Sequence, residues 1–86
     1  MATKKSNPRV AIVVWRDAHA DQTGTWTTIS KIDRKPCIVT SAGFLLEGLK
    51  PGHVALAQNL LKPDFIDHVV FIPEGMVESI TLMTAD

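Results

Sequence analysis

Short apolar runs alternate with polar and turn-forming residues along this chain, which is the pattern of a small β protein. The run RVAIVVWR at 9–16 is rich in β-branched residues and predicts a strand with both faces at least partly covered. Residues 37–47 are the strongest strand signal, and they follow Pro36, which cannot donate into a sheet ladder. Gly43 in the middle of this run indicates a bulge or a sharp bend.

The next part of the chain predicts a returning strand and then a loop. Pro51 and Gly52 favour a tight hairpin turn. We therefore interpret 53–61 as the returning strand, although its apolar spacing also fits a helix. The acidic stretch after Pro63, residues 64–67, is expected to be a loop.

The end of the chain predicts a second hairpin, with strands at 68–72 and 76–83 and a tight turn at 73–75. Together these segments make a mostly β fold of five strands, and short turns between five strands are typical of a small barrel. The first and last strands are expected to be exposed edges that invite pairing.

The remaining segments carry weaker signals. Residues 17–25 predict a polar loop, and 26–33 fit either one short helical turn or a strand. Residues 1–8 predict a flexible leader, so the expected organisation is a single β-barrel domain at 9–86.

The size of the chain makes assembly attractive. A domain of 86 residues buries only about two-thirds of its unfolded surface, so its stability is marginal. Cys37 is the only cysteine, which excludes a disulfide within the chain, and its apolar surroundings predict a small buried hydrophobe. We therefore expect a homo-oligomer. The predicted core comprises Val14, Val39, Phe44, Leu46, Leu56, Ile72 and Ile80.

The charge balance argues against a general nucleic-acid binder, because 9 basic and 9 acidic residues give a formal net charge of zero. The basic residues are clustered, however, at 4–9 and again at 31–35. The sequence is therefore still compatible with a basic surface on one side of the protein. Neither a signal peptide nor an apolar stretch long enough to span a membrane is present, and we expect a cytoplasmic protein.

One spacing suggests a metal site. Asp17, His19 and Asp21 occupy alternate positions, so an extended backbone would point these zinc or manganese ligands the same way. No second cluster of carboxylates or histidines supplies the remaining ligands, which favours a plain polar loop. Glycine-rich phosphate loops and nucleophile elbows are also missing. We expect no metal, no cofactor and no enzymatic activity.

The two tryptophans are the most informative residues. Trp15 and Trp26 bracket the polar loop, and one interpretation is that both cover the open end of a small core. The other is that they form a stacking surface or a protein interface beside Arg16, Arg34 and Lys35. The candidate ligand- or partner-binding residues are Trp15, Arg16, Asp17, His19, Trp26, Arg34 and Lys35.

Two stretches resemble the signatures of Sm-like proteins. GFLLEGLKPGHVALAQNLL at 43–61 resembles the first signature, and HVVFIPEGMVESITLM at 68–83 resembles the second. The resemblance implies an Sm/SH3-like barrel. It does not imply a uridine pocket, because residues 53–55 and 72–73 depart from the Asp, Asn and Arg-Gly positions of that family.

A closer resemblance is to a group of small bacteriophage proteins with a W-x-D-A-x loop, here residues 15–19, and a second tryptophan, here Trp26. A stretch like 36–44 and a terminal I-P motif, here Ile72-Pro73, complete the pattern. This resemblance implies a phage setting rather than a mechanism.

The expected function is therefore a small phage-type binding protein in the host cytoplasm. It would capture a nucleotide, a nucleic acid such as RNA, or a host factor, in counter-defence or host takeover. The alternative is a purely protein-binding inhibitor or adaptor, or a structural assembly module without a nucleotide ligand.

Overall fold

The computed structural model describes residues 8–21, 24–62 and 64–84, which contain five strands and two short 3₁₀ helices. The strands are β1 (Val10–Asp17), β2 (Cys37–Leu45), β3 (His53–Lys62), β4 (Phe65–Pro73) and β5 (Val77–Leu82), and the helices are η1 (Ile29–Lys31) and η2 (Glu74–Met76). The predicted mostly β fold is confirmed. The leader predicted at 1–8 lies, apart from Pro8, outside the described residues.

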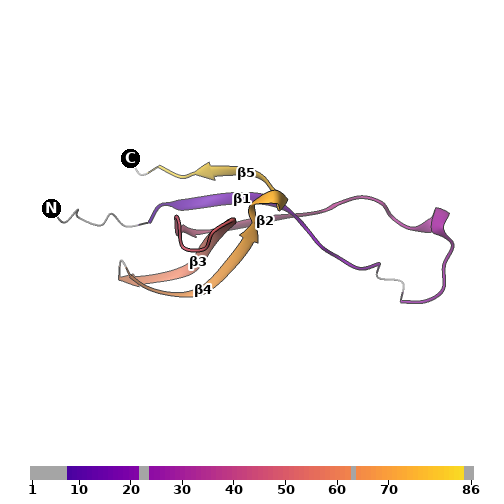
Figure 1. Ribbon diagram of the computed structural model, residues 1–86, viewed down its shortest axis with the longest axis horizontal. Helices are drawn as coiled ribbons and strands as arrows, with labels where there is room; N and C mark the ends of the chain where they lie inside the picture. The colour runs from indigo at the N-terminus through magenta and orange to yellow at the C-terminus, as the bar shows by residue number, and fades with distance from the viewer. Residues whose placement is uncertain (1–7, 22–23, 63, 85–86) are drawn as a thin grey trace.

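The strands form one antiparallel sheet in the order β4-β3-β2-β1-β5 (Figure 1). β1 is an interior strand, because Val13 lies opposite Ser41 of β2 on one side and Ile80 of β5 on the other. The prediction that the first strand is an exposed edge is therefore wrong, and the edges are β4 and β5.

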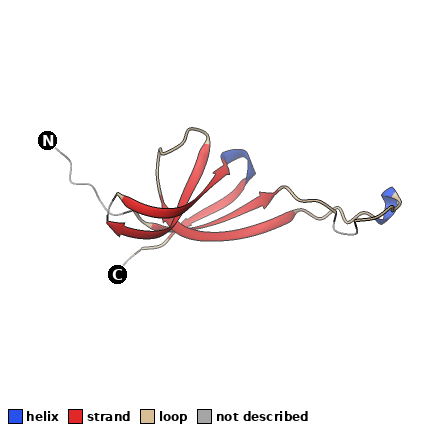
Figure 2. Cartoon of the chain, turned by 90° about the horizontal axis from the view of Figure 1, so that it is seen from below, coloured by secondary structure: helices blue, strands red, loops and turns tan. Residues whose placement is uncertain are grey.

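The sheet is open but strongly curved (Figure 2). β4 and β5 are its opposite edges, yet only the three residues of η2 join them. A flat sheet would hold its outer strands about four spacings of ~4.8 Å apart, whereas a 3₁₀ helix advances only ~2 Å per residue. The joined ends of β4 and β5 must therefore approach each other. Closure into a barrel stays a prediction.

Gly43 explains how β2 reaches its second partner. The register of β1 and β2 runs through Gly43 without a bulge, so that alternative is wrong. A Cβ at Gly43 would lie 2.7 Å from the carbonyl oxygen of Ala57, closer than real Cβ atoms come to a backbone oxygen. The glycine thus permits a close approach of β3 at the point where β2 begins to pair with it.

The core lies on one face of the sheet. Its buried cluster is Ala11, Val13, Leu56 and Ile72, against which Trp15, Leu45, Val54, Met76 and Val77 are partly buried. Leu56 and Ile72 confirm the prediction. Val14 is only half-buried, because successive residues of β1 point to opposite faces and Val13 takes the core side.

The other predicted core residues are also less buried than expected. Phe44 lies opposite Val10 on the outer face and is half-buried, as are Val39 and Leu46. Ile80 lies opposite the buried Val13, but it stays 43% exposed because β5 is an edge strand.

β4 begins at Phe65, so the loop predicted at 64–67 is wrong. Asn59 of β3 lies opposite Asp67, and its side-chain amide donates a hydrogen bond of 2.7 Å to Asp67 Oδ1. Such a polar cross-strand pair suits an edge strand, whose side chains face water. The acidic composition of 64–67 therefore reflects exposure to water and does not indicate a loop.

The turns follow the sequence more closely. Gly52 has a φ of 73°, and the His53 N–H donates to the Lys50 carbonyl at 3.2 Å, which confirms the hairpin turn. The ambiguous segment 26–33 contains η1, a single helical turn. The tight turn predicted at 73–75 is formed by η2 at 74–76, one residue later, because Pro73 still belongs to β4. No helix in the described parts of the chain is long and apolar enough to cross a membrane.

Candidate functional site: the arm between β1 and β2

Residues 18–36, which we call the arm, connect β1 to β2, and their described part, 18–21 and 24–36, projects from one end of the sheet (Figure 1). Pairing of the two strands ends where Asp17 lies opposite Cys37. Beyond that point the described arm residues, 18–21 and 24–36, contain no strand. The molecule is therefore long and narrow, with principal extents of 62, 23 and 22 Å.

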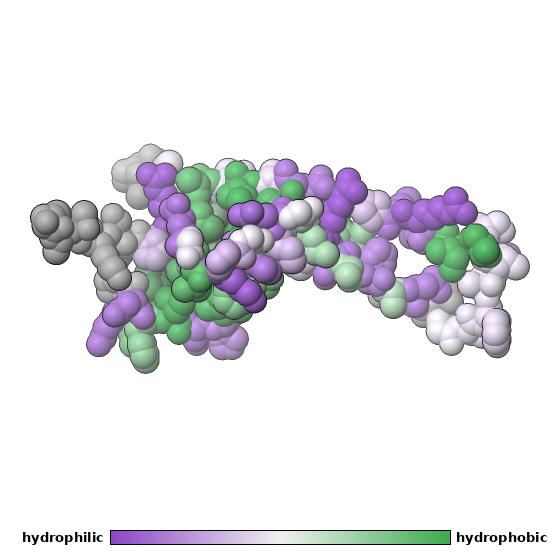
Figure 3. All heavy atoms as spheres, viewed as in Figure 1, coloured by the Kyte–Doolittle hydropathy of each residue, from purple (hydrophilic) through white to green (hydrophobic). Residues whose placement is uncertain are grey.

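The arm exposes large apolar side chains. Trp26 is 99% exposed and Ile29, in η1, is 82% exposed. η1 lies at the far end of the arm (Figure 2), where hydrophobic atoms stand apart from those of the sheet (Figure 3). Neither side chain stabilises the folded chain by burial, so both are free to contact a partner and make the arm a candidate binding surface.

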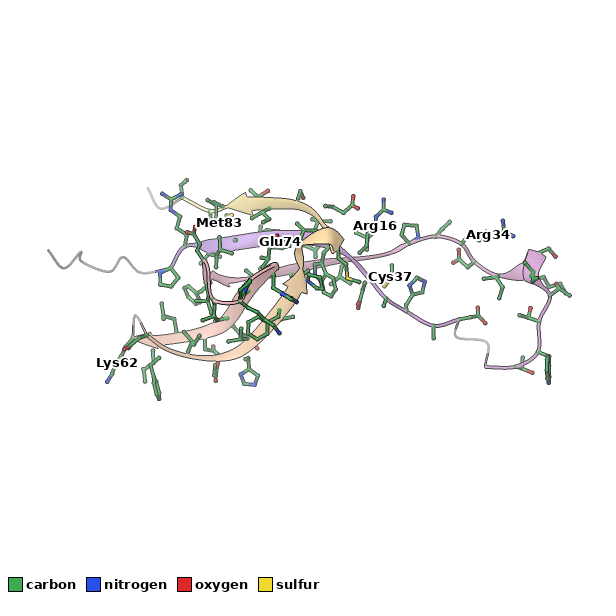
Figure 4. All side chains as sticks on the ribbon, in the orientation of Figure 1. Arg16, Arg34, Cys37, Lys62, Glu74 and Met83 are labelled. Atoms are coloured by element: carbon green, nitrogen blue, oxygen red, sulfur yellow. The ribbon has the colours of Figure 1, made fainter. Side chains whose placement is uncertain are left out.

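Cations accompany these apolar groups. Lys31, Arg34 and Lys35 are all exposed, and Arg34 lies well out along the arm (Figure 4). The backbone N–H of Lys35 donates to Asp33 Oδ1 at 3.0 Å, which orders the turn in front of Pro36. The arm thus carries an indole, an aliphatic side chain and basic groups within one segment.

The structure does not bring the two indoles together. Trp15 lies in β1, half-buried against the core, and its Nε1–H donates to Ser41 Oγ at 3.0 Å. Trp26 lies in the arm. The core-covering interpretation therefore fits Trp15, and the surface interpretation fits Trp26.

Arg16, Asp17 and His19 lie at the base of the arm. Arg16 forms an ion pair with Glu78 that links β1 to β5, and both side chains are largely exposed, so the pair adds little stability. The His19 ring contacts the Asp17 carbonyl through Nδ1 at 3.4 Å, a long hydrogen bond. Among the described residues no group of three or more histidines, cysteines or acids could hold a metal ion, and Asp17, His19 and Asp21 form no such group.

A second feature, absent from the sequence predictions, lies at the opposite end of the molecule, where β3 turns into β4. We call it the hairpin end. It contains a hollow of about 180 Å³ lined by Asn59, Leu61, Phe65, Ile66 and Asp67. Leu61 is 73% exposed and Phe65 is 62% exposed.

The acidic side of the hairpin end is ordered by hydrogen bonds. Asp67 Oδ1 accepts from Asn59 Nδ2 at 2.7 Å and contacts His68 Nδ1 at 3.1 Å. The hydrogen bond from Asn59, and then that from His68, hold the pKa of Asp67 below its ordinary value. His68 has a φ of 53°, the only positive value at a described residue other than glycine. The backbone of β4 therefore departs from regular extended geometry directly after Asp67.

The sequence contained a signal for this feature. Leu61 and Phe65 are large apolar residues on either side of Pro63, where a turn normally carries polar residues. Their exposure depends on which strands flank them, so composition alone did not reveal it.

The arm and the hairpin end both combine exposed apolar surface with charge, a composition that suits the recognition of a partner. Comparisons with protein-family models, with curated proteins and with solved structures find no match to this chain.

Proposed function

We propose that this protein is a small binding and assembly module that captures a partner protein through the arm. The observation that carries this proposal is the 99% exposure of Trp26 on a segment that projects from the sheet. A tryptophan buries about 150–250 Å² when it is covered. At ~25 cal/mol per Å², covering Trp26 would therefore contribute about 4–6 kcal/mol before the costs of association.

A protein partner is favoured over a nucleotide by another exposed side chain of the arm. Ile29 is 82% exposed and offers aliphatic surface, which a protein interface uses well and a base does not. The two-tryptophan stacking surface considered from the sequence would also need Trp15, whose indole is hydrogen-bonded over the core.

A direct test places a photo-reactive benzoylphenylalanine at position 26 and irradiates the protein in a host-cell extract. We expect a cross-linked protein whose yield falls when unlabelled wild-type protein is added as competitor. The Trp26→Ala protein should compete poorly. The same probe at Leu49, which is 54% exposed on another connection, is the matched control. Equal competition by wild-type and Trp26→Ala protein would contradict the proposal.

A second candidate is binding of single-stranded nucleic acid, which is favoured because the arm that carries the exposed indole also carries the exposed Lys31, Arg34 and Lys35. A base stacked on an indole gains about 1–3 kcal/mol. Thermal shift and tryptophan fluorescence with mononucleotides, cyclic nucleotides and short RNA test this candidate. If Trp26→Ala and Arg34→Ala leave any nucleotide response unchanged, the arm is not a nucleic-acid site.

The fold that we propose is the Sm/SH3-like barrel implied by the sequence resemblance. We also propose that the protein forms a homo-oligomer. The five strands, the curvature of the sheet and the short link between β4 and β5 support this assignment. The unpaired edges β4 and β5 favour assembly, since an edge strand presents free N–H and C=O groups. Light scattering that reports only monomer would contradict the homo-oligomer.

The setting that we propose is the cytoplasm of a phage-infected host, with a host protein as one partner in counter-defence or host takeover. The resemblance of residues 15–19 and 36–44 to small phage proteins supports this setting.

A further inference from the structure

We propose that the arm also recognises a second copy of this chain, and that Trp26 of one copy occupies the hollow at the hairpin end of the next. This inference rests on the proposed function of the arm and names one partner for it.

The hollow matches the chemistry of an indole. Leu61, Phe65 and Ile66 supply apolar walls for the rings. The contacts of the Asp67 carboxylate with Asn59 and His68 both fall on Oδ1, which leaves Oδ2 to accept a hydrogen bond from an indole N–H. Buried tryptophans favour such an arrangement, with apolar surroundings and one acceptor.

The charges of the two surfaces are opposite in sign. On the arm Lys31, Arg34 and Lys35 outnumber the described acids. At the hairpin end Asp64 and Asp67 outnumber Lys62. Contact between the two surfaces therefore brings cations to a side of the molecule with excess acid, which favours this pairing over arm against arm.

The places of the two surfaces require two molecules. Arg34 in the arm and Lys62 at the hairpin end lie at opposite ends of the long axis, which measures 62 Å (Figure 4). A chain thus has no means of placing its own Trp26 in its own hollow. The contact is head-to-tail, and such contacts form a ring where the rotation closes and a filament where it does not.

The contact is small. One covered tryptophan accounts for about 150–250 Å² on its side, well below the ~1,000 Å² of a stable interface. We therefore expect weak, concentration-dependent association that strengthens when neighbouring copies also pair along β4 or β5.

The test is a complementation experiment by sedimentation velocity. Trp26→Ala removes the indole and keeps the hollow, whereas Phe65→Ala opens the hollow and keeps the indole. Each variant alone should associate at least tenfold more weakly than wild type, as expected for the loss of one central anchor. Their equimolar mixture should form a heterodimer with wild-type affinity, because one intact indole meets one intact hollow.

Controls separate folding from binding. Thr27→Ala in the arm and Leu49→Ala on another connection should associate like wild type. Circular dichroism checks each fold, and Leu61→Ala replaces Phe65→Ala if the latter unfolds. A wild-type protein that stays monomeric, a Phe65→Ala protein that associates normally, or a mixture that remains monomeric would overturn the head-to-tail contact.

The photo-reactive residue at position 26 distinguishes this inference from the proposed function. In purified protein, a cross-link to the 59–67 segment of a second copy supports the head-to-tail contact. Cross-links only to another protein in the extract would overturn this contact and leave the proposed function intact. No cross-link in either sample would overturn both.

Discussion

The indole N–H of Trp15 donates a hydrogen bond of 3.0 Å to the hydroxyl of Ser41 on the neighbouring strand. The two residues are diagonal neighbours, because Trp15 lies opposite Val39, two residues before Ser41 and on the same face. The bond anchors the polar tip of an indole whose rings pack against the core. Trp15 is therefore held by a hydrogen bond and by core contacts, whereas Trp26 is 99% exposed.

The two tryptophans are expected to differ in their effect on stability. Trp15→Ala should lower the free energy of unfolding by about half of the ~3–5 kcal/mol seen for fully buried aromatic residues. Ser41→Ala should cost about 1 kcal/mol through the lost hydrogen bond. Trp26→Ala should change it by less than ~0.5 kcal/mol, as for other exposed side chains. Urea unfolding of the three variants measures these differences, and a large loss in Trp26→Ala would show that the arm packs on its own chain.

Gly43 should not tolerate a side chain. Gly43→Ala would place its Cβ 2.7 Å from the Ala57 carbonyl oxygen, and moving β3 away should cost about 1–3 kcal/mol. Gly75→Ala is the matched control, since nothing lies within 4 Å of its Cβ position. Thermal unfolding of both variants tests the close approach. Equal melting temperatures would mean that β2 and β3 are farther apart than the structure indicates.

Burial on the core face of the sheet predicts which apolar residues of β1 and β3 stabilise the fold most. Leu56 is 2% exposed in the core cluster, and Leu56→Ala should cost about 2–5 kcal/mol. Val13→Ala should likewise cost more than Val14→Ala, because only Val13 is buried. Chemical denaturation ranks the variants. A larger loss for Val14→Ala than for Val13→Ala would reverse the assignment of the core face.

Asn59 should control the ionisation of Asp67. Its hydrogen bond is the largest cause of the lowered pKa, so Asn59→Ala should raise the pKa of Asp67 towards the ordinary value. Because this pKa is lower in the folded state, the ionised carboxylate stabilises the fold at pH values above the ordinary pKa of aspartate. The contribution is lost as the pH falls through the folded-state pKa. Carbon-13 NMR titration of the Asp67 carboxyl in wild type, Asn59→Ala and the control Gln58→Ala measures the change. An unchanged midpoint in Asn59→Ala would remove Asn59 as the cause.

The sequence located most strands because their signals are local. The β-branched run at 9–16, the glycine turn at 51–52 and the proline before the last strand all act within a few residues. The composition gave a wrong secondary structure where polar, exposed residues belong to a strand and not to a loop. Residues 64–67 are acidic, yet three of them belong to β4, because an edge strand keeps its polar side chains in water.

The part of the candidate site that lies within one short segment was predicted because its signal is also local. Trp26, Arg34 and Lys35 were selected as a group because they crowd one polar segment, and all three are exposed on the arm. Trp15 was placed with them by sequence proximity. Its position on the core face depends on the pairing of β1 with β2, a relationship between residues 26 positions apart.

The sequence by itself determined that this chain forms short strands and tight turns, since side-chain alternation, proline and glycine constrain the backbone locally. Only the tertiary structure decided that β1 is an interior strand, that Val13 rather than Val14 faces the core, and that Trp26 is exposed on an arm that projects from the sheet. These features depend on which distant segments pair and on which face they cover, and burial is a property of those neighbours and not of the residue itself.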